Sequence, residues 1–161
     1  MIKRRVFYSF HFNNDVMRVQ QIRNIGALED NKPVSINEWE SVKKAGKKAI
    51  EKWIDDNMAS RSCIVVLVGA ETSKREWVRY EIEKAWNDGK GVVGIYIHNI
   101  KCPRSGICNR GSNPFELFNM GNKSLADIVK CHNPNPKDPY NDIKNNLERW
   151  IEEAITIRKQ Y

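Results

Sequence analysis

The sequence lacks the features that place a chain in a membrane or outside the cell. No apolar run approaches the ~20 residues needed to span a bilayer. The basic start, MIKRRVFYSF, is not followed by the small apolar residues and cleavage site of a secretory leader. The four cysteines include no CxxC pair. We therefore expect a cytoplasmic protein without a membrane partner, whose cysteines remain reduced.

Motifs for common cofactors are also missing. Cys102, Cys108 and Cys131 with His132 have spacings unlike those of structural zinc sites, so we expect no metal. No Walker A sequence is present. A GxGxxG match at 89–94 precedes a predicted strand, whereas a dinucleotide fingerprint follows a strand and opens a helix. The histidines are dispersed and no GxSxG elbow occurs, which argues against a hydrolase triad. We expect no bound cofactor.

The charge is unbalanced, with 27 Lys and Arg against 20 Asp and Glu and a formal net charge of +7. Such a chain could attract nucleic acid, a dinucleotide or an acidic partner. The lysines between 43 and 52, however, fall on the polar side of one predicted helix. The five tryptophans mostly fall on helical core stripes rather than beside basic residues. Nucleic-acid binding is therefore the weakest alternative, and we expect no nucleic-acid partner.

What the sequence does contain is an alternation of apolar strands and amphipathic helices in a chain of ordinary domain size. The segments that predict strands are 6–12, 63–69 and 92–98, with shorter ones at 34–36 and 127–131. The segments that predict helices are 16–25 (capped by Asp15 and ending at Gly26), 38–58, 76–87 and 141–160.

The run 63–69 is continuously apolar, as in a strand covered by helices on both faces of a parallel sheet. Strands separated by helices predict parallel βαβ units. We therefore predict an α/β fold with a flavodoxin-like doubly wound parallel sheet, in a single domain that spans 1–161. Residues 101–140 interrupt the pattern with repeated prolines and glycines, and so long a loop is either a lid or poorly ordered.

Ligands of a doubly wound sheet bind beyond the carboxyl ends of its strands. The segments 69–73 and 98–99 follow two of the predicted strands and belong to this edge. The end of the first strand and the turn after it bring Ser9, Phe10, His11, Asn13, Asn14 and Asp15 to the same edge. Of these, the candidate substrate-binding side chains are Ser9, Phe10, Asn14 and Asp15.

Glu81 is a charged residue on a core-facing stripe. At about 100° per residue, it falls within the half of helix 76–87 that carries its large apolar residues, between Trp77 and Ala85. Burying an unpaired carboxylate is expensive. Glu81 therefore either forms a structural ion pair or stands at a functional site, and the residues alone leave both open. The ion-pair partners that the sequence offers are Arg18, Arg23 and Arg79.

Two segments, VFYSFHFNND and TSKREWVRYEIEKA, resemble the first strand and third helix of a TIR domain. The second resembles the pattern of NAD-cleaving TIR enzymes, Ser or Thr and a short gap before Trp-x-x-x-Glu, matched at Trp77 and Glu81. Phe10 stands where those enzymes have a tyrosine. The run from FYSF to GIYIHNIK, about the first two-thirds of the chain, is similar to the TIR-like proteins of bacterial Thoeris anti-phage systems.

This resemblance implies an enzyme that cleaves NAD+ at the nicotinamide–ribose bond and makes a cyclic ADP-ribose-type signal, which activates a separate effector protein. It implies that Glu81 is the catalytic carboxylate, in a substrate site walled by Trp77 and Phe10. It also implies self-association into a homo-oligomer, because TIR enzymes commonly complete their sites across subunits. The main alternative is a non-catalytic TIR or receiver-like module that binds proteins, in which Glu81 only forms an ion pair.

Overall fold

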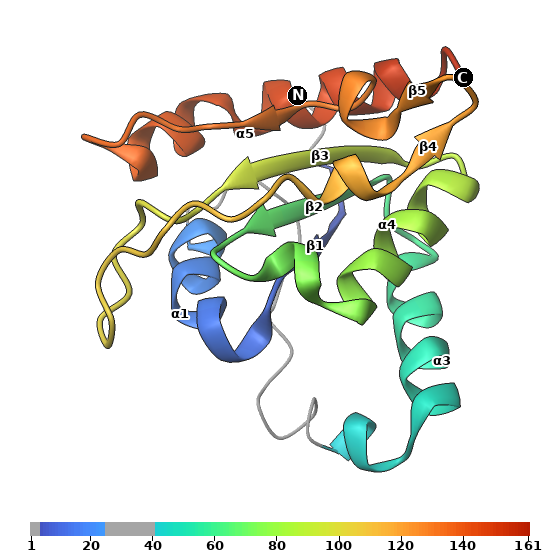
Figure 1. Ribbon diagram of the computed structural model, residues 1–161, viewed down its shortest axis with the longest axis horizontal. Helices are drawn as coiled ribbons and strands as arrows, with labels where there is room; N and C mark the ends of the chain where they lie inside the picture. Colours follow the sequence, from blue (N-terminus) through green and yellow to red (C-terminus); the bar gives the residue numbers. More distant parts are fainter. Residues whose placement is uncertain (1–3, 25–40) are drawn as a thin grey trace.

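The computed structural model describes residues 4–24 and 41–161, and in them helices alternate with strands (Figure 1). The strands are β1 (Val6–Ser9), β2 (Cys63–Val68), β3 (Gly91–Tyr96), β4 (Asn119–Met120), β5 (Lys123–Ser124) and β6 (Cys131–His132). The helices are α1 (Phe12–Arg23), α3 (Lys47–Met58), α4 (Glu76–Asn87) and α5 (Pro139–Arg158). Short 3₁₀ turns are η1 (Thr72–Lys74), η2 (Pro114–Leu117) and η3 (Leu125–Asp127). Of the described helices, none is long and apolar enough to cross a membrane.

The main sheet has the strand order β1-β2-β3-β6, and each neighbouring pair is parallel. In the register of β2, Cys63 lies opposite Val6 of β1 on one side and opposite Gly91 of β3 on the other. The arrowheads of β2 and β3 accordingly point the same way in Figure 1. The carboxyl ends of these strands therefore share one edge of the sheet, where ligands of such folds bind.

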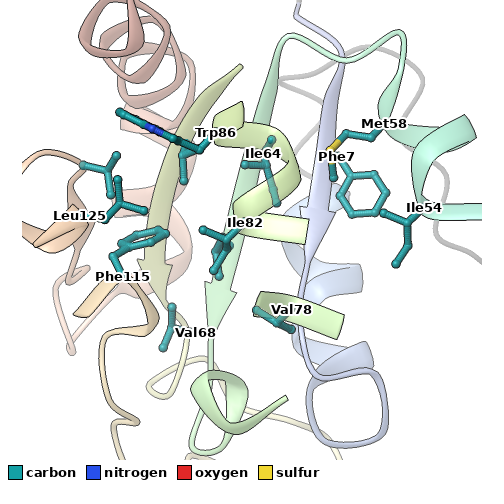
Figure 2. Close-up of a cluster of buried hydrophobic side chains, with 14 of the residues drawn as sticks. Phe7, Ile54, Met58, Ile64, Val68, Val78, Ile82, Trp86, Phe115 and Leu125 are labelled. Carbon is teal, nitrogen blue, oxygen red and sulfur yellow. The ribbon is translucent and has the colours of Figure 1, made fainter. Parts of the chain in front are cut away.

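Helices cover both faces of this sheet. Successive side chains of β2 point to opposite faces, and all of them are buried. Ile64, Val66 and Val68 pack with α3 and α4 in one cluster, part of which Figure 2 shows. Val65 and Leu67 pack with α1 and α5 in the other cluster. The parallel α/β fold with helices on both faces is confirmed.

Part of the proline- and glycine-rich segment 101–140 belongs to the core. The side chains of Phe115 (η2) and Leu125 (η3) are fully buried and lie at one end of the cluster in Figure 2. Gly94 of β3 makes room for the ring of Phe115, since a Cβ there would lie 2.8 Å from its Cε2. The expectation of a lid or a poorly ordered loop is therefore wrong for residues 114–132, which form 3₁₀ turns, a small hairpin and the edge strand β6 and which add buried side chains to the core.

The first helix starts earlier than predicted. β1 ends at Ser9 and α1 begins at Phe12, with His11 as its N-cap residue. Asp15 therefore does not cap the helix but lies inside its first turn, where it is buried. The predicted helix end at Ile25 and Gly26 lies outside the described residues.

Other boundaries differ in detail. Gly46, with a φ of 97°, separates helical residues 41–44 from α3, because a positive φ interrupts the helix predicted over 38–58. Where a strand was predicted at 127–131, η3 is followed by the two-residue strand β6. The predicted edge strand at 34–36 lies outside the described residues, whereas α4 has the predicted range.

Candidate functional site

Buried polar atoms without a hydrogen-bond partner collect at the carboxyl edge of the sheet. Buried polar groups in folded proteins nearly always have a partner, so each exception calls for an explanation. A polar ligand bound at this edge would supply the missing partners. Among the residues that the structure describes, the unpartnered atoms at this edge are Ser9 Oγ, His11 Nδ1, Asp15 Oδ2, Glu81 Oε2 and His98 Nδ1.

The carboxyl group of Glu81 is buried on the inner face of α4, where 8% of the residue remains exposed. The apolar residues Val78 and Ile82 lie on the same buried face of the helix. Burial raises the pKa of Glu81 from 4.5 to about 8, and the nearby hydroxyl of Ser9 opposes this shift. Ser9 lies at the end of β1, so Glu81 stands beside the ligand edge of the sheet.

The ion pair that the sequence left open as one alternative for Glu81 is not found within residues 4–24 and 41–161. Arg18 pairs with Asp15, at 2.7 Å between Nη1 and Oδ1. The guanidinium of Arg79 donates to the carbonyl oxygen of Lys74 at 3.3 Å. In this part of the chain, burial without a counter-ion is what sets the protonation of Glu81.

Asp15 and Arg18 form a buried pair beside the end of β2, with side chains 1% and 3% exposed. Burial raises the pKa of Asp15, and the guanidinium of Arg18 partly offsets that shift. Gly69, directly after β2, must lack a side chain, because a Cβ there would lie 2.7 Å from Cγ of Asp15. Asp15 thus lies against the end of β2 with one oxygen bound to Arg18 and the other without a partner.

The other predicted substrate-binding residues lie around this edge in different settings. The side-chain amide of Asn14 is exposed and donates to Oε2 of Glu71 at 3.2 Å, which ties the start of α1 to the turn after β2. Phe10 is half-buried and packs on the α1 and α5 side of the sheet. Trp77 packs on the α3 and α4 side, edge-on to Tyr80 at 5.6 Å between ring centroids.

The two aromatic residues predicted to wall one site therefore pack against clusters on opposite faces of the sheet. Their joint contact with a substrate stays a prediction.

The pKa values of two histidines at the edge are lowered, which favours their neutral form. Burial lowers the pKa of His11, and the charge of Arg75 lowers it further. His98 follows β3, and its pKa is lowered by burial and by Arg110. Neutral imidazoles offer a donor and an acceptor, so these side chains are suited to polar recognition rather than to binding an anion. No group of three or more His, Cys, Asp or Glu side chains able to hold a metal occurs in the described ranges.

Residues 100–113 extend from the end of β3 and return past the carboxyl ends of β2 and β3 (Figure 1). Cys102 and Gly106 exchange backbone hydrogen bonds at the turn, and the Cys108 amide donates to the carbonyl of His98 at 2.9 Å. Gly111 lies directly on the residues that follow β2, because a Cβ there would lie 2.8 Å from the carbonyl oxygen of Ala70. This part of the irregular segment does cover the ligand edge.

Arg18 was not predicted to lie at this edge. The sequence suggested it only as an ion-pair partner for Glu81. A signal was nevertheless present. Asp15, Arg18, Val19 and Ile22 are the buried residues of α1 and follow the i, i+3, i+4, i+7 spacing of one helix face. Two oppositely charged residues three positions apart on an otherwise apolar stripe indicate a buried pair.

Comparison with known proteins places this geometry in a family. Residues 7–101, which include β1, α1 and α4 with Glu81, match the family model of the Thoeris protein ThsB, TIR-like domain. A protein of Bacillus cereus (strain MSX-D12), named "Putative cyclic ADP-D-ribose synthase ThsB1", is 34% identical over 134 residues. That alignment covers 80% of this chain and 69% of the relative. The chain belongs to the ThsB family of TIR-like Thoeris proteins.

Proposed function

We propose that this protein cleaves NAD+ at the nicotinamide–ribose bond and turns the ADP-ribosyl part into a cyclic ADP-ribose-type signal, with Glu81 as the catalytic carboxylate. The observation that carries the proposal is the buried carboxyl group of Glu81. It has no ion-pair partner within the described residues and stands beside Ser9 at the ligand edge. The name of the Bacillus cereus relative gives the same class of product.

The chemistry requires little more than one such carboxylate. Nicotinamide leaves as a neutral pyridine, so the leaving group needs no general acid. The ribose becomes an oxocarbenium ion, as in glycoside hydrolysis. A carboxylate in a water-excluded site stabilises this positive charge more strongly than it would in water. Glu81 has no counter-ion in the described residues, and the positive charge that develops on the ribose becomes its counter-ion.

Neighbouring groups have supporting roles in this proposal. The hydroxyl of Ser9 lies close enough to the carboxylate of Glu81 to favour its ionised form, and it orients that group when substrate is bound. The free Oδ2 of Asp15 accepts a hydrogen bond from the substrate. Trp77, Phe10 and Asn14 contact the substrate from the rim of the site, where they are half-buried or exposed.

The product acts at a distance from this protein. We propose that it diffuses in the cytoplasm to an effector protein, and that copies of this chain associate with one another to complete their sites. The protein then uses NAD+ as a substrate rather than as a bound cofactor. The rival hypothesis of a non-catalytic interaction module depends on a structural ion pair for Glu81, and no such pair occurs in the described residues.

The test is the fate of NAD+ in lysates of cells that express the protein, with and without phage infection. We expect nicotinamide and a nucleotide with the mass of ADP-ribose less one water, identified by liquid chromatography and mass spectrometry. Lysates without the protein serve as the control. Nicotinamide release no greater than in that control would contradict the proposal, and linear ADP-ribose as the only product would contradict cyclisation.

The activity of the purified protein should depend on pH through Glu81. Burial raises the pKa of this carboxyl group to about 8, so most of it is protonated at neutral pH before substrate binds. Because only the carboxylate stabilises the cation, kcat/KM should rise with pH and level off above about pH 8.

A Ser9→Ala variant provides the matched comparison for this profile. It removes the hydroxyl that lowers the pKa of Glu81, so the midpoint of its kcat/KM profile should move to higher pH. A wild-type profile that stays flat between about pH 6 and pH 9 would argue against an essential carboxylate with a raised pKa.

A further inference from the structure

Arg18 makes more hydrogen bonds than its pairing with Asp15 requires. Its side chain is buried, and each nitrogen of the guanidinium donates. Nη1 donates to Oδ1 of Asp15 at 2.7 Å and to the carbonyl oxygen of Asn14 at 3.2 Å. Nε donates to the carbonyl oxygen of Ile100 at 2.9 Å, and Nη2 to that of Gly106 at 2.7 Å. One planar group thus joins α1 to two points of the chain that leaves β3.

These two points lie just before a closed turn, at Ile100, and at its end, at Gly106. The backbone hydrogen bonds between Cys102 and Gly106 fix the turn itself. Gln21, one turn further along α1, donates to the carbonyl oxygen of Lys101 at 2.8 Å and holds the same strand of the turn. Arginine suits this role because its donors form a rigid fork, whereas the lysine ammonium is a compact point charge on a flexible stem.

The chain beyond this turn passes over the ligand edge. The amide of Cys108 bonds the carbonyl of His98, and Gly111 lies on the carbonyl groups of Gly69 and Ala70. Residues 107–111 are therefore placed across the end of β2, next to the strand that ends at Ser9. Their position depends on the turn that Arg18 holds.

Such a cover matters for the fate of the reactive cation. Cleavage breaks the bond between C1′ of the ribose and the pyridinium nitrogen, which keeps both electrons and leaves as neutral nicotinamide. A nucleophilic atom of the same molecule then bonds to C1′, with loss of a proton where that atom is a hydroxyl oxygen, and gives the cyclic product. Water attacking C1′ and losing a proton gives linear ADP-ribose. Excluding water favours the first outcome.

We propose that Arg18 is a positioning residue that holds residues 107–111 over the reaction site and thereby sets the ratio of cyclic to linear product. This inference rests on the proposed function. Arg18 does not touch the reacting atoms. It acts through the backbone of Ile100 and Gly106, which connect α1 to the cover.

The test is an Arg18→Lys variant incubated with NAD+, with cyclic and linear products measured together. Lysine keeps the charge that Asp15 requires but loses the fork that reaches both carbonyl groups. We expect the cyclic-to-linear ratio to fall about tenfold, the effect of losing one or two hydrogen bonds that hold the cover closed. The ratio describes each turnover, so a smaller folded fraction lowers total product without changing it.

Two further variants keep the test decisive. Gln21→Ala removes the exposed bond to Lys101 and a longer one, at 3.4 Å, to the carbonyl oxygen of Met17 within α1. It should lower the ratio in the same direction by a smaller factor, even if Arg18→Lys fails to fold. Arg149→Lys changes an exposed arginine of α5, whose partner is Asn146, and should leave the ratio at the wild-type value. Limited trypsin digestion provides a second readout, since cleavage after the exposed Lys101 should be faster in Arg18→Lys.

The outcomes separate the two proposals. If the wild type forms cyclic product and both Arg18→Lys and Gln21→Ala keep its ratio, the role of Arg18 is overturned while the proposed function stands. If Arg18→Lys does not fold and Gln21→Ala keeps the wild-type ratio, that role is overturned as well. If the wild type releases no nicotinamide, the proposed function is wrong, and the inference that depends on it is wrong as well.

Discussion

Glu81→Gln should abolish nicotinamide release from NAD+, with kcat/KM at least about a thousandfold below wild type. Glutamine has nearly the same shape as glutamate but no charge, so it fits the buried position on α4 and cannot stabilise an oxocarbenium ion. The measurement is nicotinamide release by the purified protein, or by infected-cell lysate, at a pH above 8, where the wild-type carboxyl group is ionised.

The same variant should be more stable than wild type at high pH. The pKa of Glu81 is raised from 4.5 to about 8 on folding, so the folded state favours the protonated form. The resulting stabilisation is fully present below pH 4.5 and is lost as the pH rises through about 8. Glutamine carries no such dependence. We therefore expect Glu81→Gln to exceed wild type by roughly 2–4 kcal/mol in free energy of unfolding near pH 9, and by little near pH 5.

Glu83→Gln is the matched control, since Glu83 is an exposed carboxylate on the same helix. It should leave activity at the wild-type level and change stability by no more than about 0.5 kcal/mol. Turnover retained in Glu81→Gln would remove the central role of this residue. Loss of stability at every pH would instead support a structural partner for its charge.

Phe115→Ala should lower the free energy of unfolding by about 3–5 kcal/mol. The ring of Phe115 is fully buried against the sheet and fills the space left by Gly94, so its removal creates a cavity that the neighbouring backbone cannot close. Urea unfolding followed by circular dichroism measures the loss. Because η2 follows the chain that covers the ligand edge, this variant should also lower the fraction of cyclic product.

Leu117→Ala gives the comparison for this prediction. Leu117 belongs to the same 3₁₀ turn but is 53% exposed, so its truncation should cost less than about 0.5 kcal/mol. A loss below about 1 kcal/mol for Phe115→Ala would mean that the irregular segment adds little to the core.

The sequence predicted those parts of the fold that have a clear period or a continuous apolar run. The central strand could be predicted because both faces of β2 are covered, so all of its residues are buried and its apolar run is unbroken. α4 was visible because its buried residues recur with helical spacing. The same spacing predicted the burial of Glu81, because it depends only on neighbours along one helix.

Other features depend on contacts between distant parts of the chain and left no such pattern. Phe115 lies among prolines and glycines without any period, and only its packing against Gly94 shows that it is a core residue. Asp15 was expected to cap a helix because its type favours that position, but burial with Arg18 decides its place. The proximity of Ser9 to Glu81 likewise follows from the packing of α4 on the sheet, which a single sequence does not encode as a motif.

The contact of Gly111 with Gly69 and Ala70 is made by backbone alone. Its fit depends on the absence of a side chain at position 111 and not on the chemical character of the residues that flank it. The side chains of Arg104 and Ile107 are exposed on the outer surface of the same segment, whereas the guanidinium of Arg110 lies 5.4 Å from the centre of the Tyr96 ring. Substitution at positions 104 and 107 can therefore alter what the segment presents to solvent or to a partner while the closure beneath it is kept.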